Sequence, residues 1–369
     1  MSTDDWGGHD RRRANGRYAG ELELCDGDPI VVLPAEEERT PRDLEPGRRY
    51  LVTGCAGFIG SHLTQALSAR GDAVVGVDAF TDNYARAIKE RNLELCRATG
   101  GVAFAEVDLA DAPLEPLLDG VDGIFHLAAR PGVRTSWGPT FDRYLRDNLS
   151  ATQRVFEAAV ERGVRVVYAS SSSVYGAAEA YPLQEDAKPM PVSPYGVSKL
   201  ACEALACAYG ASVGLDAVGM RFFSVYGPRQ RPDMAFAAIF DCLVCNRPFH
   251  LFGNGRQTRD FTFVGDVVEA ALAAMRDAPS GRVYNVGGGS EISMLDALTL
   301  CERIVGRRLD VRRDGAGTGD ARRTLADFGR AAAELGWAPT TSLEEGLRAQ
   351  AGDALAADVE PPPALAQTV

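Results

Sequence analysis

The stretch TGCAGFIG, residues 53–60, lies between a short apolar run (Tyr50 to Thr53) and an amphipathic segment (Ser61 to Arg70). This order predicts a strand, a tight glycine turn and a helix. Glycines in such a turn let backbone amides approach a pyrophosphate, and the helix amino terminus adds partial positive charge. Three glycines before a helix can also be only a tight turn, so the surrounding sequence decides between the two interpretations.

An acidic residue at the end of the next apolar run favours the ligand interpretation. Asp78 closes the run that starts at Ala73, 24 residues after Gly54. A carboxylate there can accept both hydrogen bonds from the diol of an adenosine ribose, and it would repel a 2′-phosphate. The pattern therefore predicts NAD rather than NADP. Asp108 and Leu109 follow the third apolar run, where the adenine edge should lie, although Asp108 could instead cap a helix.

Short β-branched runs alternate with amphipathic segments over the first two thirds of the chain. This rhythm predicts a doubly wound α/β fold, in which helices cover both faces of a parallel sheet. After Gly227 the rhythm loosens, which indicates a smaller C-terminal α/β lobe that completes a cleft at the carboxyl ends of the strands. The expected strands are residues 50–53, 73–77, 102–107, 123–127, 164–170 and 215–222.

The domain boundaries follow from the same pattern. Residues 1–47 are rich in charge, Gly and Pro and predict a disordered extension, and residues 351–369 predict a flexible tail. Between them we expect a Rossmann domain at 48–226 with a returning segment around 260–288. Residues 227–259 and 289–350 would form the substrate-binding lobe.

Composition excludes several classes of protein. The chain has 369 residues, 46% of them hydrophobic, and a net charge of -12, which disfavours binding to nucleic acid or an anionic membrane. The eight cysteines are scattered and no apolar secretion segment opens the chain, so a cytoplasmic location with reduced thiols is expected. Cys242 and Cys245 form a CxxC pair without a second pair, and four histidines are too few to change our expectation of no metal site.

Tyr195 and Lys199 are the candidate catalytic pair. They are four residues apart in a segment that reads as a helix from Pro194 to Gly210, so their side chains share one face. The lysine ammonium can stabilise a tyrosinate, which is a competent base for a sugar hydroxyl, and can hold a nicotinamide ribose. A serine run, residues 170–173, ends the preceding strand, where a hydroxyl could bridge the tyrosine and the reacting oxygen. A polar loop is the alternative for that run.

These motifs together resemble the extended short-chain dehydrogenase/reductases, specifically the nucleotide-sugar epimerases and dehydratases, over roughly residues 48–350. The segments that carry the resemblance are TGCAGFIGSHL, HLAA, SSSSVYG, SPYGVSK and RDFTFVGDVV. The resemblance implies about seven strands in the Rossmann sheet, a tightly held NAD, a homodimer through residues 141–161 and 194–210, and catalysis by Tyr195, Lys199 and Ser171. It implies cofactor contacts from Gly54, Gly57, Phe58, Ile59, Gly60, Asp78, Asn83, Asp108, Leu109, Leu127, Ala128, Ala129, Asn148, Tyr195, Lys199 and Phe222.

Departures from relatives narrow the reaction. The sequence that resembles this one in 4,6-dehydratases has Thr-Asp-Glu before VYG, and this chain has Ser172 and Ser173 in place of the Asp and Glu. UDP-glucuronate decarboxylases also carry a glutamate at the position of Ser173. The segments RPGVRTSW and FFSVYGPRQRPDMA resemble UDP-glucuronate 4-epimerases. In that comparison Ser224 and Arg231 would hold the uronate carboxylate, with Arg231 the main charge partner. By similarity Arg259 would contact the diphosphate, with a surface salt bridge as the alternative. The other expected substrate contacts are Arg134, Ser172 and Ser173. Arg130 and Pro131 depart from the usual Gln-Ala, and Gly265 stands where an acid is common.

The expected reaction is therefore C4 epimerisation of a nucleotide sugar, with UDP-glucuronate as the first candidate. A UDP-glucose 4-epimerase would use the same core without an arginine bound to C6. A decarboxylase or a dTDP-sugar 4,6-dehydratase would release CO2 or water. A non-catalytic NAD-binding sensor is the candidate from another class, and the intact Tyr195 and Lys199 argue against it.

Overall fold

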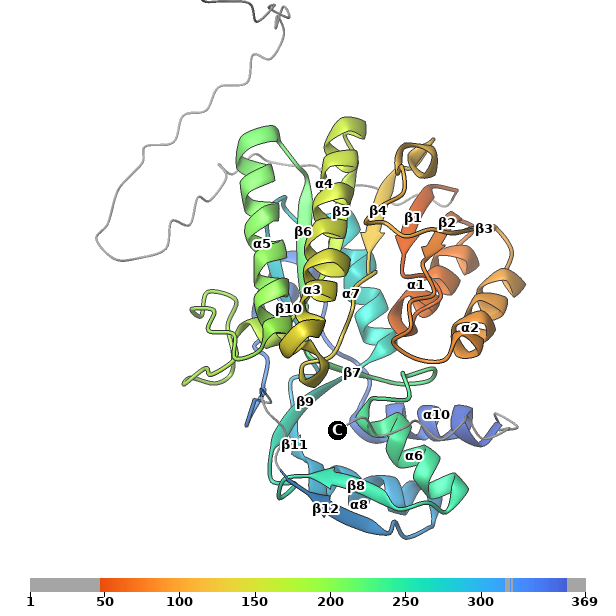
Figure 1. Cartoon of the computed structure of the whole chain (residues 1–369), viewed down its shortest axis with the longest axis vertical. Helices are drawn as coiled ribbons and strands as arrows, with labels where there is room; N and C mark the ends of the chain where they lie inside the picture. The colour runs from red at the N-terminus through yellow and green to blue at the C-terminus, as the bar shows by residue number, and fades with distance from the viewer. Residues whose placement is uncertain (1–46, 316–318, 320, 357–369) are drawn as a thin grey trace, which may run out of the picture. The chain divides into compact units, whose positions relative to one another are not determined.

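The central sheet has seven parallel strands in the order β10-β6-β5-β4-β1-β2-β3 (Figure 1). The computed structural model describes residues 47–315, 319 and 321–356. From β1 the chain adds β2 and β3 on one side and then β4, β5 and β6 on the other, so the strand order reverses between β1 and β4. Doubly wound sheets bind ligands at such a point, at the carboxyl ends of their strands. The predicted fold class is confirmed.

The sheet and its covering helices have these bounds: β1 Arg49–Thr53, α1 Phe58–Ala69, β2 Ala73–Asp78, α2 Arg86–Ala98, β3 Val102–Glu106, β4 Gly123–His126, α3 Phe141–Tyr144, α4 Ala151–Arg162, β5 Arg165–Ser171, α5 Pro194–Val213, β6 Ala217–Phe222, α7 Val264–Asp277, β10 Val283–Val286 and α9 Gly329–Leu335. A π-helical segment, Leu145–Ser150, joins α3 to α4.

Alternate residues of the strands enter two separate cores, because successive side chains of a strand point to opposite faces. Tyr50 and Val52 of β1 pack with α1, α7 and α9, whereas Leu51 between them packs with α4 and α5. Both faces of the sheet are covered (Figure 1). This is why the strands read as nearly continuous apolar runs in the sequence.

A smaller lobe follows β6, and its core is separate from the two cores of the sheet. Its helices α6, α8 and α10 pack together around Phe236, Phe240 and Leu347. Three strands form one small sheet and two form another. The bounds are β7 Ser224–Tyr226, α6 Ala235–Cys245, β8 Phe249–Phe252, β9 Thr258–Phe263, β11 Glu291–Ser293, α8 Met294–Val305, β12 Val311–Asp314 and α10 Leu343–Ala356.

Helix α10 corrects one boundary. The tail was expected from residue 351, but α10 continues to Ala356. Gln350 and Ala351 are buried, and the Gln350 side chain accepts a hydrogen bond from the Gly227 amide, so tertiary contacts extend the helix. The expected extension, except for Gly47, and the rest of the tail lie outside the described residues.

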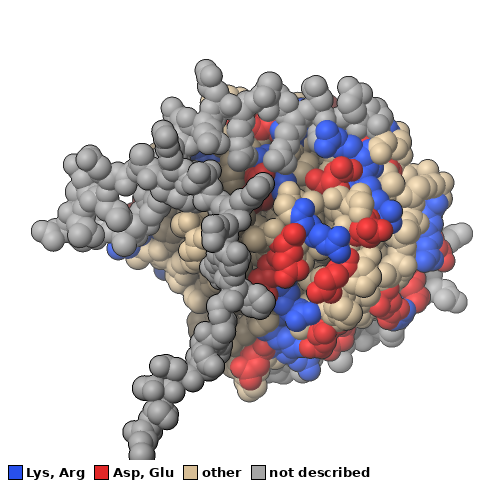
Figure 2. Space-filling model, turned by 90° about the horizontal axis from the view of Figure 1, so that it is seen from above, with Lys and Arg blue, Asp and Glu red and all other residues tan. Residues whose placement is uncertain are grey.

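Figure 2 shows acidic and basic side chains interspersed on the face that it presents, outside its grey atoms. Within residues 47–315, 319 and 321–356, no helix combines the length and the apolar character needed to cross a membrane.

Candidate active site

A cavity of about 360 Å³ lies where the strands β1 to β6 end, at the junction with the smaller lobe. Most of the residues singled out from the sequence line it. They are Gly54, Gly57, Phe58, Ile59, Gly60, Asp78, Asn83, Asp108, Leu109, Leu127, Ala128, Ala129, Ser171, Tyr195, Lys199, Phe222, Ser224 and Arg231. Segments up to 177 residues apart in the chain, from Gly54 to Arg231, therefore meet at one site.

The glycine turn is shaped by contacts that only glycine permits. Gly54 has φ +71°, and a Cβ there would lie 2.9 Å from the Ala128 amide nitrogen. A Cβ on Gly60 would lie 2.0 Å from the Gly54 carbonyl oxygen, so α1 can start directly against the turn. The amino end of α1 thus lies directly at the cavity. This cradle fits a dinucleotide pyrophosphate.

Asp78 ends β2 at the cavity wall and is held in place by two donors. Its Oδ1 accepts from the Phe80 amide (2.8 Å) and from Lys89 Nζ (3.2 Å). Both charged side chains are buried, with 7% and 6% of their surface exposed. A second carboxylate oxygen remains for a ribose hydroxyl. The sequence analysis missed Lys89, because a single lysine on an amphipathic helix gives no sign that it points inward.

The candidate catalytic residues gather at the opposite end of the cavity, from two elements. Tyr195 and Lys199 project from the first turns of α5, whose amino terminus is capped by Ser193, which accepts from the Gly196 amide (3.1 Å). Lys199 Nζ donates to the Ala169 carbonyl (2.8 Å), which fixes the helix to the end of β5. Ser171 is the last residue of β5, so its hydroxyl lies on the same wall as the two side chains.

A buried ion pair fixes α5 from behind. Arg221 of β6 donates to Glu203 of α5 (Nη2 to Oε2, 2.7 Å), and both side chains are at least nine-tenths buried. Arg221 also donates to the Tyr175 hydroxyl (2.8 Å), and burial raises the pKa of Tyr175 to about 12. The phenol therefore stays neutral near pH 7. The pair positions the helix that carries Tyr195 without lining the cavity.

Asn148 lies outside the cavity but connects its two ends. Its Oδ1 accepts from the Arg130 amide (2.6 Å), and its Nδ2 donates to the Arg130 carbonyl (3.1 Å) and to Ser198 Oγ (3.0 Å). Ser198 stands next to Lys199 on α5. The expectation that Asn148 supports the cofactor region is consistent with these contacts, and the support is indirect.

The smaller lobe contributes Arg231. Its guanidinium is paired with Asp233 through two contacts, Nε to Oδ1 (3.0 Å) and Nη2 to Oδ2 (2.9 Å). The Arg231 side chain is 19% exposed and lines the cavity together with Ser224 of β7. Asp233 thus takes up one bidentate edge of the guanidinium.

Four expected substrate contacts do not line this cavity. Arg134 stacks over the Phe252 ring at 4.0 Å, so it links the loop after β4 to the smaller lobe. Arg259 of β9 donates to the Thr258 carbonyl (2.9 Å). Ser172 and Ser173 form a 3₁₀ turn after β5, in which the Ser173 amide donates to Ser171 Oγ (3.1 Å). Neither of these two serines lines the cavity, whereas Ser171 does.

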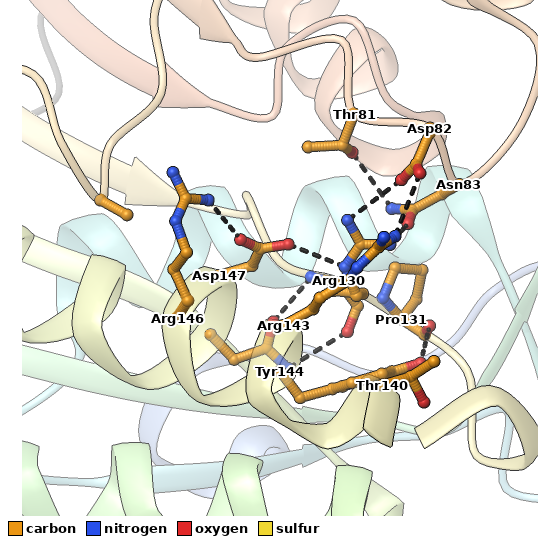
Figure 3. Close-up of polar contacts among 12 residues, drawn as sticks. Thr81, Asp82, Asn83, Arg130, Pro131, Thr140, Arg143, Tyr144, Arg146 and Asp147 are labelled. Atoms are coloured by element: carbon orange, nitrogen blue, oxygen red, sulfur yellow. Dashed lines mark hydrogen bonds and ion pairs between the residues drawn. The ribbon is translucent and has the colours of Figure 1, made fainter. Parts of the chain in front are cut away.

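The sequence analysis also missed a polar group beside the glycine turn, which Figure 3 shows in close-up. Arg130 and Asp147 both line the cavity and form an ion pair (2.7 Å). Arg130 was noted only as a departure from relatives. Charged residues in a loop and on a helix are typical of a solvated surface, so no pattern could have indicated that these two face the cofactor cavity.

Comparisons with known proteins give the family. Residues 50–287 match the model of the NAD dependent epimerase/dehydratase family, which is more than half of the chain. The chain belongs to this family. NAD is the cofactor on which the family depends, and the glycine cradle and Asp78 fit it.

Individual relatives are similar over almost their whole length. A UDP-glucose epimerase of Bacillus subtilis (strain 168), described as uncharacterized, is 41% identical over 81% of this chain and 95% of its own. UDP-glucuronate 4-epimerase of Thermodesulfobacterium geofontis is 35% identical over 81% and 94%. The crystal structure of UDP-glucuronic acid 4-epimerase from Bacillus cereus, in complex with UDP-glucuronic acid and NAD, has a TM-score of 0.80 at 38% identity, covering 83% of this chain and 99% of that one.

Proposed function

We propose that this member of the family is a UDP-sugar 4-epimerase and that UDP-glucuronate is its substrate. The observation that carries the proposal is that one cavity is lined by all four residues, Ser171, Tyr195, Lys199 and Arg231. Similarity to UDP-glucuronate 4-epimerases over nearly their full length supports it. NAD would supply the chemistry of accepting and returning a hydride at C4.

The residues of the chain would handle the proton and hold the sugar. Tyr195 takes the proton of the C4 hydroxyl, directly or through the Ser171 hydroxyl, and later returns it. The Lys199 ammonium stabilises the phenolate and holds the nicotinamide ribose. The 4-keto sugar turns over in the cavity and is reduced on its other face, so no net oxidation results. Asp78, Asn83, Asp108 and Leu109 would hold the adenosine half of the cofactor.

Arg231 would decide the fate of a uronate. Oxidation at C4 makes a β-keto acid, which loses CO2 when the carboxylate bond aligns with the carbonyl π system. A guanidinium and the Ser224 hydroxyl that grip the carboxylate can hold it out of that alignment. Arg231 would thus act as an anchor and as a safeguard against decarboxylation.

UDP-glucose is the second candidate substrate, and one observation favours it. Asp233 already makes two contacts with the Arg231 guanidinium, at 3.0 and 2.9 Å. Because Asp233 already balances the charge of Arg231, the site does not require a second negative charge at C6 of the sugar. The neutral hydroxymethyl group of glucose would then fit as well as a uronate carboxylate. Similarity to a UDP-glucose epimerase of Bacillus subtilis points the same way.

Dehydration and decarboxylation are disfavoured by the residues after Ser171. Elimination of water across C5 and C6 needs an acid and a base beside the sugar, and this chain has Ser172 and Ser173 at the corresponding positions. Serine hydroxyls do not supply that proton chemistry near pH 7.

The test is to incubate the purified protein with UDP-glucuronate, UDP-glucose and dTDP-glucose and to analyse products by mass spectrometry and NMR. The proposal expects UDP-galacturonate of unchanged mass from UDP-glucuronate. Conversion of UDP-glucose alone would make the second candidate the function. A product that has lost 44 or 18 mass units, as CO2 or water, would contradict epimerisation.

We also propose that the protein is a homodimer in the cytoplasm. Val197, Ala204 and Ala208 form an exposed stripe of small apolar residues along α5, and Ala201 is half-buried in it. Such a stripe permits close packing against the same helix of a second copy. Ala204→Glu should convert a dimer to a monomer in light scattering. A wild-type protein that is already monomeric at micromolar concentration would contradict the dimer.

A further inference from the structure

A group of polar side chains surrounds Arg130 (Figure 3). The guanidinium donates in three directions: Nε to Asp147 Oδ2 (2.7 Å), Nη1 to Asn83 Oδ1 (2.6 Å) and Nη2 to Asp82 Oδ1 (3.2 Å). The planar fork of an arginine, with its five N–H donors, is suited to three acceptors spread in this way. The side chain therefore ties two separate segments to the loop that carries it.

The order of strands places this bridge over the glycine turn. Arg130 follows β4, whereas Asp82 and Asn83 follow β2. In the sheet, β1 lies between β4 and β2, and the turn at Gly54 follows β1. A side chain that joins the loops after β4 and β2 must therefore pass across the end of β1. A dinucleotide bound to the glycine turn would run beneath it.

Burial and anchoring indicate that the bridge is a fixed part of the cavity. The Arg130 side chain is 14% exposed and that of Asp147 is 12% exposed, whereas Asp82 is 68% exposed. Arg130, Asn83 and Asp147 line the cavity. The Arg130 backbone is held on both sides by Asn148, so the bridge is anchored at the β4 end and its outer contact faces solvent.

We propose that Arg130, with Asp82, Asn83 and Asp147, forms a clasp that crosses over bound NAD and controls how fast the cofactor leaves and enters. The clasp has to open before a dinucleotide can pass between the loops after β2 and β4. The proposal rests on NAD binding and holds whichever sugar is the substrate. Arg130 is a positioning residue here and takes no part in the chemistry at C4.

A direct contact between Arg130 and the pyrophosphate is the competing explanation, and the acceptors distinguish the two. If Arg130 only bound phosphate, removing the charge of Asp82 or Asp147 would leave the arginine in place and would not speed NAD release. If it acts as a clasp, loss of either acceptor should speed release, because the bridge then has one secured end fewer. Asp82 is suited to this test, since an exposed side chain can be changed without disturbing the core.

The experiment follows exchange of NAD on the holoenzyme. Enzyme loaded with NAD is mixed with excess etheno-NAD, and bound NAD is measured over time by filtration and chromatography. We expect Arg130→Gln to raise the release rate by about tenfold or more, and Asp82→Asn and Asp147→Asn by smaller factors. Association should speed up in the same variants, because the same clasp opens for entry, so Kd should change less than the release rate.

Arg143→Gln is the matched control. Arg143 donates to Asp82 Oδ2 (3.1 Å) but is 58% exposed and does not line the cavity, so release should match that of the wild type. Thermal midpoints separate a folding defect from faster exchange. The clasp is refuted if Arg130→Gln alone speeds release while both aspartate variants exchange like the wild type, or if none of the three variants changes the rate. Failure to epimerise any sugar would contradict the proposed function without affecting this result.

Discussion

The two ends of the cavity are built differently. The cofactor end is made by the glycine turn and the loops after β2 and β4. There Lys89 of α2 pairs with Asp78 of β2, and Arg130 pairs with Asp147 of the π-helical segment. The sugar end combines one helix of the Rossmann part with Arg231 from the smaller lobe. We therefore expect cofactor binding to depend on backbone shape and ion pairs, and sugar specificity to depend on a few side chains.

The largest effect is expected from a variant that removes the proton carrier, Tyr195, at the sugar end. Tyr195→Phe should lower kcat by roughly 10³-fold, because the C4 hydroxyl loses its base. Binding of NAD at the other end should be preserved, since the glycine cradle and Asp78 are unchanged. Turnover is measured by NMR of the product and bound NAD by chromatography after denaturation. Near-normal turnover in this variant would mean that Tyr195 is not the base, and the two ends would have to be assigned anew.

Removing the cation of the sugar end should have the next largest effect. Arg231→Ala should raise KM for UDP-glucuronate by about tenfold or more, since a charge-assisted pair is lost, and should raise the share of decarboxylated pentose product. KM for UDP-glucose should change much less. The double variant Arg231→Ala with Asp233→Asn controls for the uncompensated aspartate. An unchanged KM and an unchanged product ratio would remove Arg231 from the carboxylate site.

The same contrast explains what could be predicted from the sequence. The cofactor end follows contiguous patterns: a strand, a glycine turn and an acid at a fixed spacing, so Gly54, Asp78 and Leu109 were expected at the cavity and line it. The fold class follows from the period of apolar residues for the same reason. Tyr195 and Lys199 share one helix face because of a local spacing, and Ser171 ends a strand, so these too could be placed.

What could not be predicted depends on contacts between side chains of different helices, strands and loops. Lys89 reaches Asp78 from the next helix, and Arg130 reaches Asn83 from 47 residues away. Arg134 stands near Arg130 in the sequence but stacks on Phe252, because the 3₁₀ turn that carries it faces the smaller lobe. Helix α10 extends beyond the expected end since Gln350 is held by Gly227. None of these contacts has a periodic or compositional signature.

A smaller effect is expected when Asp233, which pairs with Arg231, loses its charge. Asp233→Asn should lower KM for UDP-glucuronate severalfold, because the Arg231 guanidinium no longer has to exchange one carboxylate for another. KM for UDP-glucose should stay within about twofold, since no charge enters with that sugar. Steady-state kinetics with both sugars measure the change in preference. A higher KM for UDP-glucuronate would show that Asp233 orients Arg231 rather than competing for it.

The smallest effect on catalysis is expected at a contact between helix α1 and the turn after β7. His62 of α1 lies with Nε2 at 2.9 Å from the Pro228 carbonyl oxygen, next to Arg229. Burial, and then the charge of Arg229, lower the pKa of His62 from its ordinary 6.5 to about 4. The folded protein therefore keeps this imidazole neutral where the unfolded chain protonates it.

Because the pKa is depressed on folding, the stabilisation from neutral His62 is complete above about pH 6.5 and is lost as pH falls toward 4. At pH 5 the loss is about 2 kcal/mol. His62→Gln can keep the hydrogen bond to Pro228 and does not titrate. Its activity at pH 7.5 should match the wild type, and its thermal midpoint should fall by roughly 3 °C less between pH 7.5 and pH 5. If both proteins lose the same amount on acidification, His62 is not the group that makes stability fall in this pH range.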